Sequence, residues 1–204
     1  VLALVMSLSL VTIASGADFN DADEIELTEA VDVMSAIGVL EGHNTGDFAP
    51  KGTLQRDQAA KIITYMLLGE NAERLSVAST SFSDVAANRW SAADIEYCTT
   101  LGIIAGNGDG TFGPTKALTG YAFAKMLLTA LGYKADAENL TGTGWTVNVS
   151  RLALQIGLDD GIEGITWSDP LTREQAAQMA LNAIKTPLVQ YDDGVTVIVN
   201  GTPV

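Results

Sequence analysis

The chain has little positive charge and almost no cysteine or histidine. Only 11 of its 204 residues are lysine or arginine, against 25 acidic residues, so the formal net charge is −14. Nucleic-acid binding needs a basic surface, and this composition argues against it. The single cysteine, Cys98, cannot form an internal disulfide, and the single histidine, His43, lies in a polar loop with no serine, cysteine or metal-ligand cluster near it. We therefore expect neither a metal nor a cofactor.

The first residues are apolar and carry no charge. Residues 1–13 form the apolar run, and the small residues of 14–17 follow it. This pattern is typical of the hydrophobic part and cleavage site of a secretory signal, and it is too short to span a membrane. We expect cleavage after Ala17, an exported protein and no membrane span in the mature chain. A buried strand or helix of the mature fold is the alternative.

A segment of the chain recurs nearly three times. Gly-Val-Leu-Glu-Gly at 38–42 and Gly-Ile-Ile-Ala-Gly at 102–106 each precede a polar loop, and a leucine follows 16 residues after the first glycine, at Leu54 and Leu118. A looser copy begins at Gly157 and continues to Leu171. Because one such unit cannot bury its apolar face alone, the three copies are expected to pack together.

Each unit is predicted to be a helix, a loop and a second helix. Apolar residues recur at helical spacing on both sides of the loop, Gly102 suits the end of a helix, and Phe112 suits a plug in the core. The predicted helices are 25–37 and 55–68 in the first unit and 147–156 and 172–184 in the third. In the second unit they run from Ser91 or Ala92 to about Leu101 and from Leu118 or Thr119 to about Leu131.

Two arginines occupy an unusual helix position. Thr172 and Gln175 form a predicted capping box, which places Arg173 at the first helical residue. A cation there is unfavourable by about 0.3–1 kcal/mol, so we expect an anionic ligand to compensate it. Arg56 has the same position in the first unit, whereas the second unit has Gly120.

These residues resemble the S-layer homology family. Unit 2 matches its repeat pattern most closely, with Phe82-Ser83-Asp84-Val85, then Trp90, then the glycine loop and Leu118-Thr119. Unit 1 contains Phe19-Asn20-Asp21 and Leu54-Gln55-Arg56, and unit 3 contains Trp145 and Leu171-Thr172-Arg173-Glu174-Gln175. The resemblance covers about residues 19–186.

The resemblance implies a mainly α fold, in which three repeats form a pseudo-threefold, trefoil-like bundle, with a short β segment at the C-terminus. It also implies a non-catalytic module that binds secondary cell-wall polysaccharide, an anionic and often pyruvylated glycan, and holds a secreted protein on the bacterial cell wall. The expected boundaries are 1–17 for the signal peptide, 18–69 for repeat 1 (unit 1), 82–133 for repeat 2 (unit 2), 145–186 for repeat 3 (unit 3), and 187–204 for the start of a truncated β domain.

The predicted ligand-binding residues follow from this resemblance and from their chemistry. Arginines suit a carboxylate, indoles suit sugar faces, and a glycine loop brings backbone amides close to a ligand. The set is Arg56, Arg173, Thr172, Trp90, Trp145, Gly106 and Asp109. Unit 2 lacks the arginine and unit 1 lacks the tryptophan, so we expect one or two competent grooves.

Other roles for these residues remain open. The arginines could pair with the neighbouring acids Asp57 and Glu174, and Trp90 and Trp145 could anchor the core, as large aromatic side chains usually do. Asp109 is better explained as a turn residue that caps its own loop than as a calcium ligand, because the loop lacks the acid that a calcium-binding hand needs at its last position.

The chain ends in a predicted strand, Val195–Val199, followed by the hairpin signal Asn200-Gly201 and a return strand from Thr202. We expect this strand to be unpaired and to belong to a further β domain. Two further functions stay open: an anchor for an exported polysaccharide-acting enzyme, and an S-layer subunit that self-associates through further domains.

Overall fold

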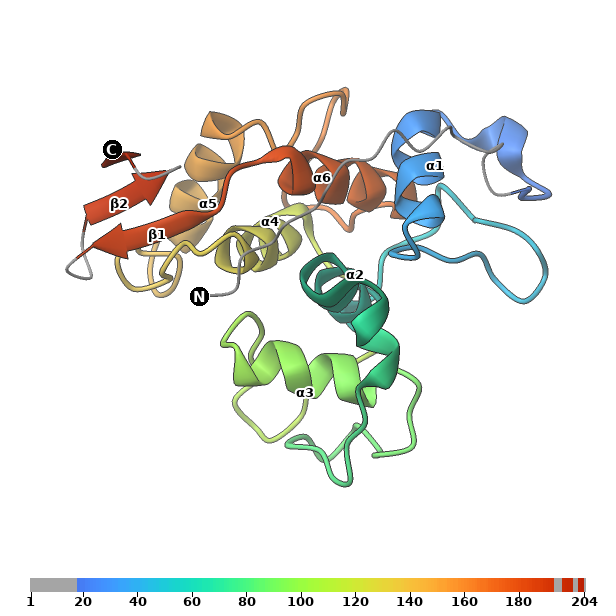
Figure 1. Cartoon of the computed structure of the whole chain (residues 1–204), viewed down its shortest axis with the longest axis horizontal. Helices are drawn as coiled ribbons and strands as arrows, with labels where there is room; N and C mark the ends of the chain where they lie inside the picture. Colours follow the sequence, from blue (N-terminus) through green and yellow to red (C-terminus); the bar gives the residue numbers. More distant parts are fainter. Residues whose placement is uncertain (1–17, 193–195, 200–201, 204) are drawn as a thin grey trace.

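The protein is mainly helical, as predicted (Figure 1). The computed structural model describes residues 18–192, 196–199 and 202–203, so the predicted signal segment lies outside the described residues. None of the described helices is both long and apolar enough to cross a membrane. The helices are α1 (Thr28–Ala36), α2 (Arg56–Leu68), α3 (Ala92–Thr100), α4 (Gly120–Ala130), α5 (Trp145–Gln155) and α6 (Arg173–Lys185), with 3₁₀ turns η1 (Ala22–Glu24) and η2 (Gly69–Arg74).

All six helices coincide with predicted ones, and their first residues differ from the predicted ones by no more than three positions. Helix α1 begins three residues later than predicted, because the backbone amides of Glu26 and Leu27 donate to the Glu174 carboxylate instead of joining a helix. Helix α5 begins two residues earlier, at Trp145, directly after Gly144, which has a left-handed backbone conformation.

A ring of three hydrogen bonds joins the units at their centre. The amide of Leu54 donates to the carbonyl of Leu171, the amide of Leu118 to the carbonyl of Leu54, and the amide of Leu171 to the carbonyl of Leu118. The N–O distance is 2.9 Å in each bond. The leucines hold the same place in the three units, directly before α2, α4 and α6, and all are buried. The ring gives the fold its pseudo-threefold symmetry and connects residues more than fifty positions apart.

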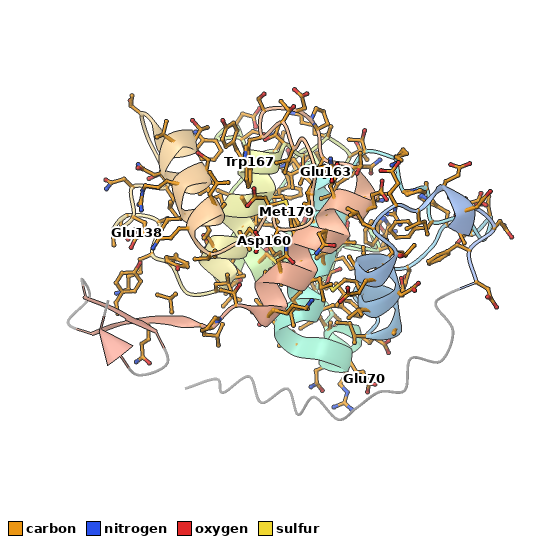
Figure 2. The ribbon with its side chains drawn as sticks, turned by 90° about the horizontal axis from the view of Figure 1, so that it is seen from above. Glu70, Glu138, Asp160, Glu163, Trp167 and Met179 are labelled. Carbon is orange, nitrogen blue, oxygen red and sulfur yellow. The ribbon has the colours of Figure 1, made fainter. Side chains whose placement is uncertain are left out.

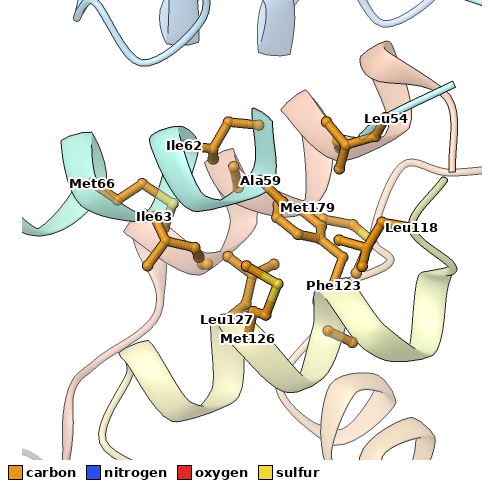
Figure 3. Close-up of a cluster of buried hydrophobic side chains, with 14 of the residues drawn as sticks. Leu54, Ala59, Ile62, Ile63, Met66, Leu118, Phe123, Met126, Leu127 and Met179 are labelled. Carbon is orange, nitrogen blue, oxygen red and sulfur yellow. The ribbon is translucent and has the colours of Figure 1, made fainter. Parts of the chain in front are cut away.

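The helices pack between units. Helix α3 packs on α2, α5 packs on α4, and α1 packs on α6, so the first and last units are also in contact (Figure 1). At the centre, Ile63 of α2 faces Leu127 of α4, with Phe123 of α4 and Met179 of α6 close by (Figure 3). Each unit therefore buries its apolar face only when its neighbours are present.

The loops end their helices in the predicted way. Gly102 has a φ of +70°, and the amide of Ile103 donates back to Cys98, which closes the end of α3. Phe112 fills the core with 1% of its surface exposed, as predicted. The Asp84 carboxylate accepts from the amides of Phe112 and Gly113, each at 2.7 Å, and the first of these bonds is the main cause that lowers its pKa.

A small antiparallel sheet follows the helices. Strand β1 (Val189–Asp192) pairs with β2 (Thr196–Val199), and β2 pairs with β3 (Thr202–Pro203). The predicted strand is present over Thr196–Val199 and its return over Thr202–Pro203, whereas Val195 and the predicted turn at Asn200-Gly201 lie outside the described residues. The expectation that the strand is unpaired is wrong, because β1, which the sequence analysis missed, supplies its partner.

One helix interface contains buried polar groups. Asp94 of α3 is 7% exposed, and burial raises its pKa to about 6, although Lys61 opposes this shift. Cys98, one turn further on, is fully buried as expected, and its sulfur lies 3.5 Å from the Thr64 hydroxyl of α2. The equivalents of Asp94 in the other units are buried and apolar, Ala30 and Val149. Only this one of the three helix pairs therefore carries a buried acid at that position.

Replacing Asp94 with asparagine is expected to remove a pH-dependent loss of stability. The folded-state pKa lies above the usual value of an aspartate, so the folded protein holds this proton more tightly than the unfolded chain. Stability should rise as pH falls from 7 towards 4 and fall as pH rises through about 6, by an amount on the order of 2 kcal/mol. Asp94→Asn should be the more stable protein at pH 7.5 and nearly equal to wild type only near pH 3.5, below the usual pKa of an aspartate in the unfolded chain.

Thermal unfolding of both proteins at the two pH values measures this difference. The exposed acid Asp136 gives a control, because Asp136→Asn removes the same charge from the surface. Equal pH dependence in wild type and Asp94→Asn would contradict the role assigned to this carboxyl.

Candidate functional site

The pseudo-threefold arrangement creates three equivalent positions at the junctions between units, which we number sites 1 to 3. Site 1 is a cavity of about 590 Å³ built from all three units. Its walls are the loop at 39–44 and the face of α2 from unit 1, with Trp90 from unit 2 and Arg173 from unit 3.

An exposed indole and an ammonium group line site 1. Trp90 is 57% exposed, so it is not the core anchor that was the alternative to its predicted binding role. Lys61, from the second turn of α2, also lines the cavity, and its Nζ lies 2.7 Å from Oε2 of Glu41. The side chain of Lys61 is 22% exposed and that of Glu41 is 65% exposed.

The buried side chain of Arg173 holds the loop that forms one wall of site 1. Its Nε donates to the carbonyl of Phe48 at 2.8 Å, its Nη2 donates to the carbonyl of Glu41 at 2.9 Å, and its guanidinium lies 4.8 Å from the centre of the Phe48 ring. Only 5% of the residue is exposed, and burial lowers its pKa. An arginine remains charged even so, and three of its five N–H donors are left over.

Arg56 makes the same contacts with unit 2, at site 2. Its Nε donates to the carbonyl of Phe112 and its Nη2 to that of Ala105, both at 3.0 Å, and it lies 4.4 Å from the Phe112 ring centre. The two arginines thus bind the glycine loop of the next unit to the start of their own helix.

The predicted anion site at the helix N-terminus is wrong, because its amides are occupied. The first two amides of α6, those of Arg173 and Glu174, donate to the carbonyls of Gly52 and Pro50. The first two amides of α2 are used in the same way, by carbonyls at 116 and 114. Arginine at this position is explained by the carbonyl groups that its side chain reaches.

The alternative that the arginines pair with neighbouring acids also fails. Asp57 is bound by Arg89 from the start of unit 2. Glu174 is bound by Lys51, whose Nζ lies 2.6 Å from its Oε1. These acids connect each helix start to the next unit and leave the arginine guanidinium groups to the loop carbonyls.

Site 2 repeats the ammonium and the indole. Lys125 lies one repeat after Lys61, and its Nζ is 5.6 Å from the centre of the Trp145 ring, a cation–π distance. Trp145 is partly buried and meets the edge of Tyr121, with ring centres 6.2 Å apart. It therefore serves partly as a packing residue, which the sequence analysis had left open.

Site 3 lacks all three groups. Glu26 replaces the tryptophan, Gly120 the arginine and Gln178 the lysine. A cavity of about 320 Å³ at this junction is lined by Glu26 and by Lys51, which is 2.7 Å from Glu26 Oε1. A side chain at Gly120 would lie 3.1 Å from the backbone of Trp167, so that chain must shift to admit one.

Trp167 and Glu163, both from the loop that precedes α6, lie on one side of the molecule, and Glu70, just after α2, lies on the opposite side (Figure 2). The starts of α2 and α6, which are hydrogen-bonded through the leucine ring, therefore face the side that carries Trp167. Glu163 also lines the cavity of site 3.

The remaining predicted residues have local structural roles. Thr172 and Gln175 form the predicted capping box, and Thr172 lines site 3. A side chain at Gly106 would lie 2.5 Å from the Phe82 ring, so this glycine permits close packing. The Asp109 carboxylate accepts from the Thr111 amide at 2.9 Å, which confirms that Asp109 caps its own loop.

Sequence reasoning missed the two lysines. Their separation in sequence equals that of Gly38 and Gly102, the first glycines of the repeated segment, so the repeat itself contained the signal. A further cavity of about 640 Å³ lies between α5, α6 and β1. It contains none of the predicted residues and mixes the charges of Arg151 and Glu138 at its lining.

Comparison with known proteins identifies the second unit. Residues 81–124 match the S-layer homology domain. The chain contains an S-layer homology domain. Units 1 and 3 share three features with this S-layer homology unit. Each contributes one leucine to the central ring, each pairs its helices with those of the neighbouring units, and in each the first helix ends at a glycine with positive φ.

Three of the proteins to which the chain is similar have the names of surface or anchoring proteins. It is 28% identical to a cell surface protein of Thermoanaerobacter kivui over 96% of the chain and 25% of that protein. It is 30% identical to the surface-layer 125 kDa protein of Lysinibacillus sphaericus over 86% of the chain and 16% of that protein. It is 33% identical to a cellulosome-anchoring protein of Acetivibrio thermocellus over 43% of the chain and 20% of that protein. The chain spans a quarter or less of each relative.

Truncating Trp90 is expected to leave the fold intact. Because the side chain is largely exposed, Trp90→Ala should change the free energy of unfolding by no more than about 0.5 kcal/mol. Phe112→Ala, which empties a buried position, should cost about 3–5 kcal/mol. Urea unfolding of the two variants measures both values, and a loss of several kcal/mol in Trp90→Ala would show that the indole is a core residue.

Proposed function

We propose that the chain is a non-catalytic module that anchors a secreted protein to the bacterial cell wall by binding an anionic secondary polysaccharide. The observation that carries the proposal is the combination of an ammonium, an indole and a guanidinium at site 1, repeated at site 2. The names of the relatives, a cell surface protein, a surface-layer protein and an anchoring protein, support the same location.

The chemistry of these groups suits an acidic sugar. A lysine at the edge of the cavity offers a charged hydrogen bond to a carboxylate, such as that of a pyruvyl ketal. An indole beside it offers an apolar plane against which a sugar ring can stack. The buried guanidinium adds positive potential beneath them and holds the loop that forms the wall of the site.

The negative charge of the chain restricts where an anionic polymer can bind. At a net charge of −14, an anionic polymer is repelled from most of the surface. Binding then depends on the few places where cations are concentrated, which we assign to sites 1 and 2. Site 3 has an acid in place of the indole, and its lysine, Lys51, is already paired with Glu26 and Glu174, so we propose that it does not take part.

Cell-wall binding provides the direct test. The full chain should sediment with cell-wall sacculi that retain their secondary polymer and should not sediment with sacculi from which the polymer has been stripped. Equal binding to the two preparations would contradict the proposal. Binding should also weaken as salt is raised, because exposed charge interactions are screened.

Removing both lysines should reduce this binding at least tenfold. Each charged hydrogen bond that is lost costs about 1.5–3 kcal/mol, so Lys61→Ala with Lys125→Ala should have a large effect. Lys185→Ala is the matched control, since this exposed lysine of α6 pairs with Glu29 and lines none of the three sites. The double variant should keep the wild-type melting temperature to within a few degrees, which separates lost binding from lost folding.

A further inference from the structure

We propose that Glu41 competes with the ligand for Lys61, so that site 2 binds the anionic glycan more tightly than site 1. The inference rests on the proposed function and adds an order of affinity between two sites that carry the same three groups. It assigns to Glu41, a residue of the glycine loop, the role of lowering the affinity of site 1.

The two lysines differ in their acidic neighbours. At site 1, Glu41 Oε2 lies 2.7 Å from Lys61 Nζ, and both residues line the same cavity. Lys61 also faces the buried Asp94 of α3, whose ionised form it stabilises. The ammonium of Lys61 therefore already has one direct carboxylate partner and a second acid nearby.

Site 2 has no counterpart of this pair. The residue that corresponds to Glu41 is Ala105, one repeat later, and the residue that corresponds to Asp94 is Val149. Lys125 forms no ion pair with any side chain of residues 18–191, the part of the chain whose side chains the structure describes here. Its ammonium lies over the Trp145 ring instead. Burial alone lowers the pKa of Lys125.

This difference sets what a ligand must displace. A carboxylate that enters site 1 has to replace Glu41 at the ammonium of Lys61, and the displaced carboxylate then remains close to the ligand with the same charge. A carboxylate that enters site 2 meets an ammonium without an acidic partner. A partly exposed ion pair of this kind stabilises the protein only modestly, so the affinity difference should be about three- to tenfold.

The test uses the full chain with site 2 disabled. In a Lys125→Ala background, Glu41→Gln should raise the affinity for polymer-bearing sacculi about three- to tenfold, because site 1 is then free of its internal carboxylate. Glutamine keeps the size of the side chain, and Glu41 accepts the Arg173 bond through its backbone carbonyl, which the substitution leaves in place.

The matched control is Glu29→Gln in the same background. It makes the same change in net charge and also breaks an ion pair, that of Glu29 with Lys185 at 3.5 Å, but it lies on α1 outside the three sites. Affinity in this control should stay within about twofold of the Lys125→Ala background. In otherwise wild-type protein, Lys125→Ala should weaken binding more than Lys61→Ala does.

The outcomes separate this inference from the proposed function. If the wild type binds the polymer but Glu41→Gln has no effect, or gains no more than Glu29→Gln, the competition by Glu41 is wrong and the anchoring function stands. A larger loss from Lys61→Ala than from Lys125→Ala would also overturn the order of the sites. If no variant and no wild type binds polymer-bearing sacculi, both proposals fall together.

Discussion

The ring of hydrogen bonds among Leu54, Leu118 and Leu171 is the constraint on which the remaining structure depends. Each bond joins two units, so the three bonds place the starts of α2, α4 and α6 against one another. Those starts determine where the side chains of the following turns point. The arginines reach the loops of the next units, and the lysines one turn and a half later reach the cavity, because the ring has oriented their helices.

Much of this architecture follows from the repeat. The helices, the glycine at the end of α3 and the plug Phe112 were predicted because each depends on local spacing and on burial, which the sequence displays directly. The packing partners of the helices were not predicted. That α1 packs on α6 follows from closure of the bundle, which is a property of three units together.

The candidate site was predicted only in part, and for the same reason. Arg56 and Arg173 were correctly picked out as unusual at a helix start, but the groups that satisfy them are backbone carbonyls of another unit, which no local pattern reveals. Lys61 was missed because one lysine on a helix is ordinary. It becomes distinctive only when Trp90 is brought beside it from the next unit.

The pairing of α1 with α6 also limits how such a protein can change through evolution. In an open stack of repeats, a copy can be gained or lost at either end with little effect on the others. Here the last unit packs against the first, so a fourth unit would find no free surface to pack against. The loss of one unit would expose the packing surfaces of its two neighbours. Diversity must then arise by altering individual junctions while their number stays at three, which is the pattern that Glu26, Gly120 and Gln178 display at the third of them.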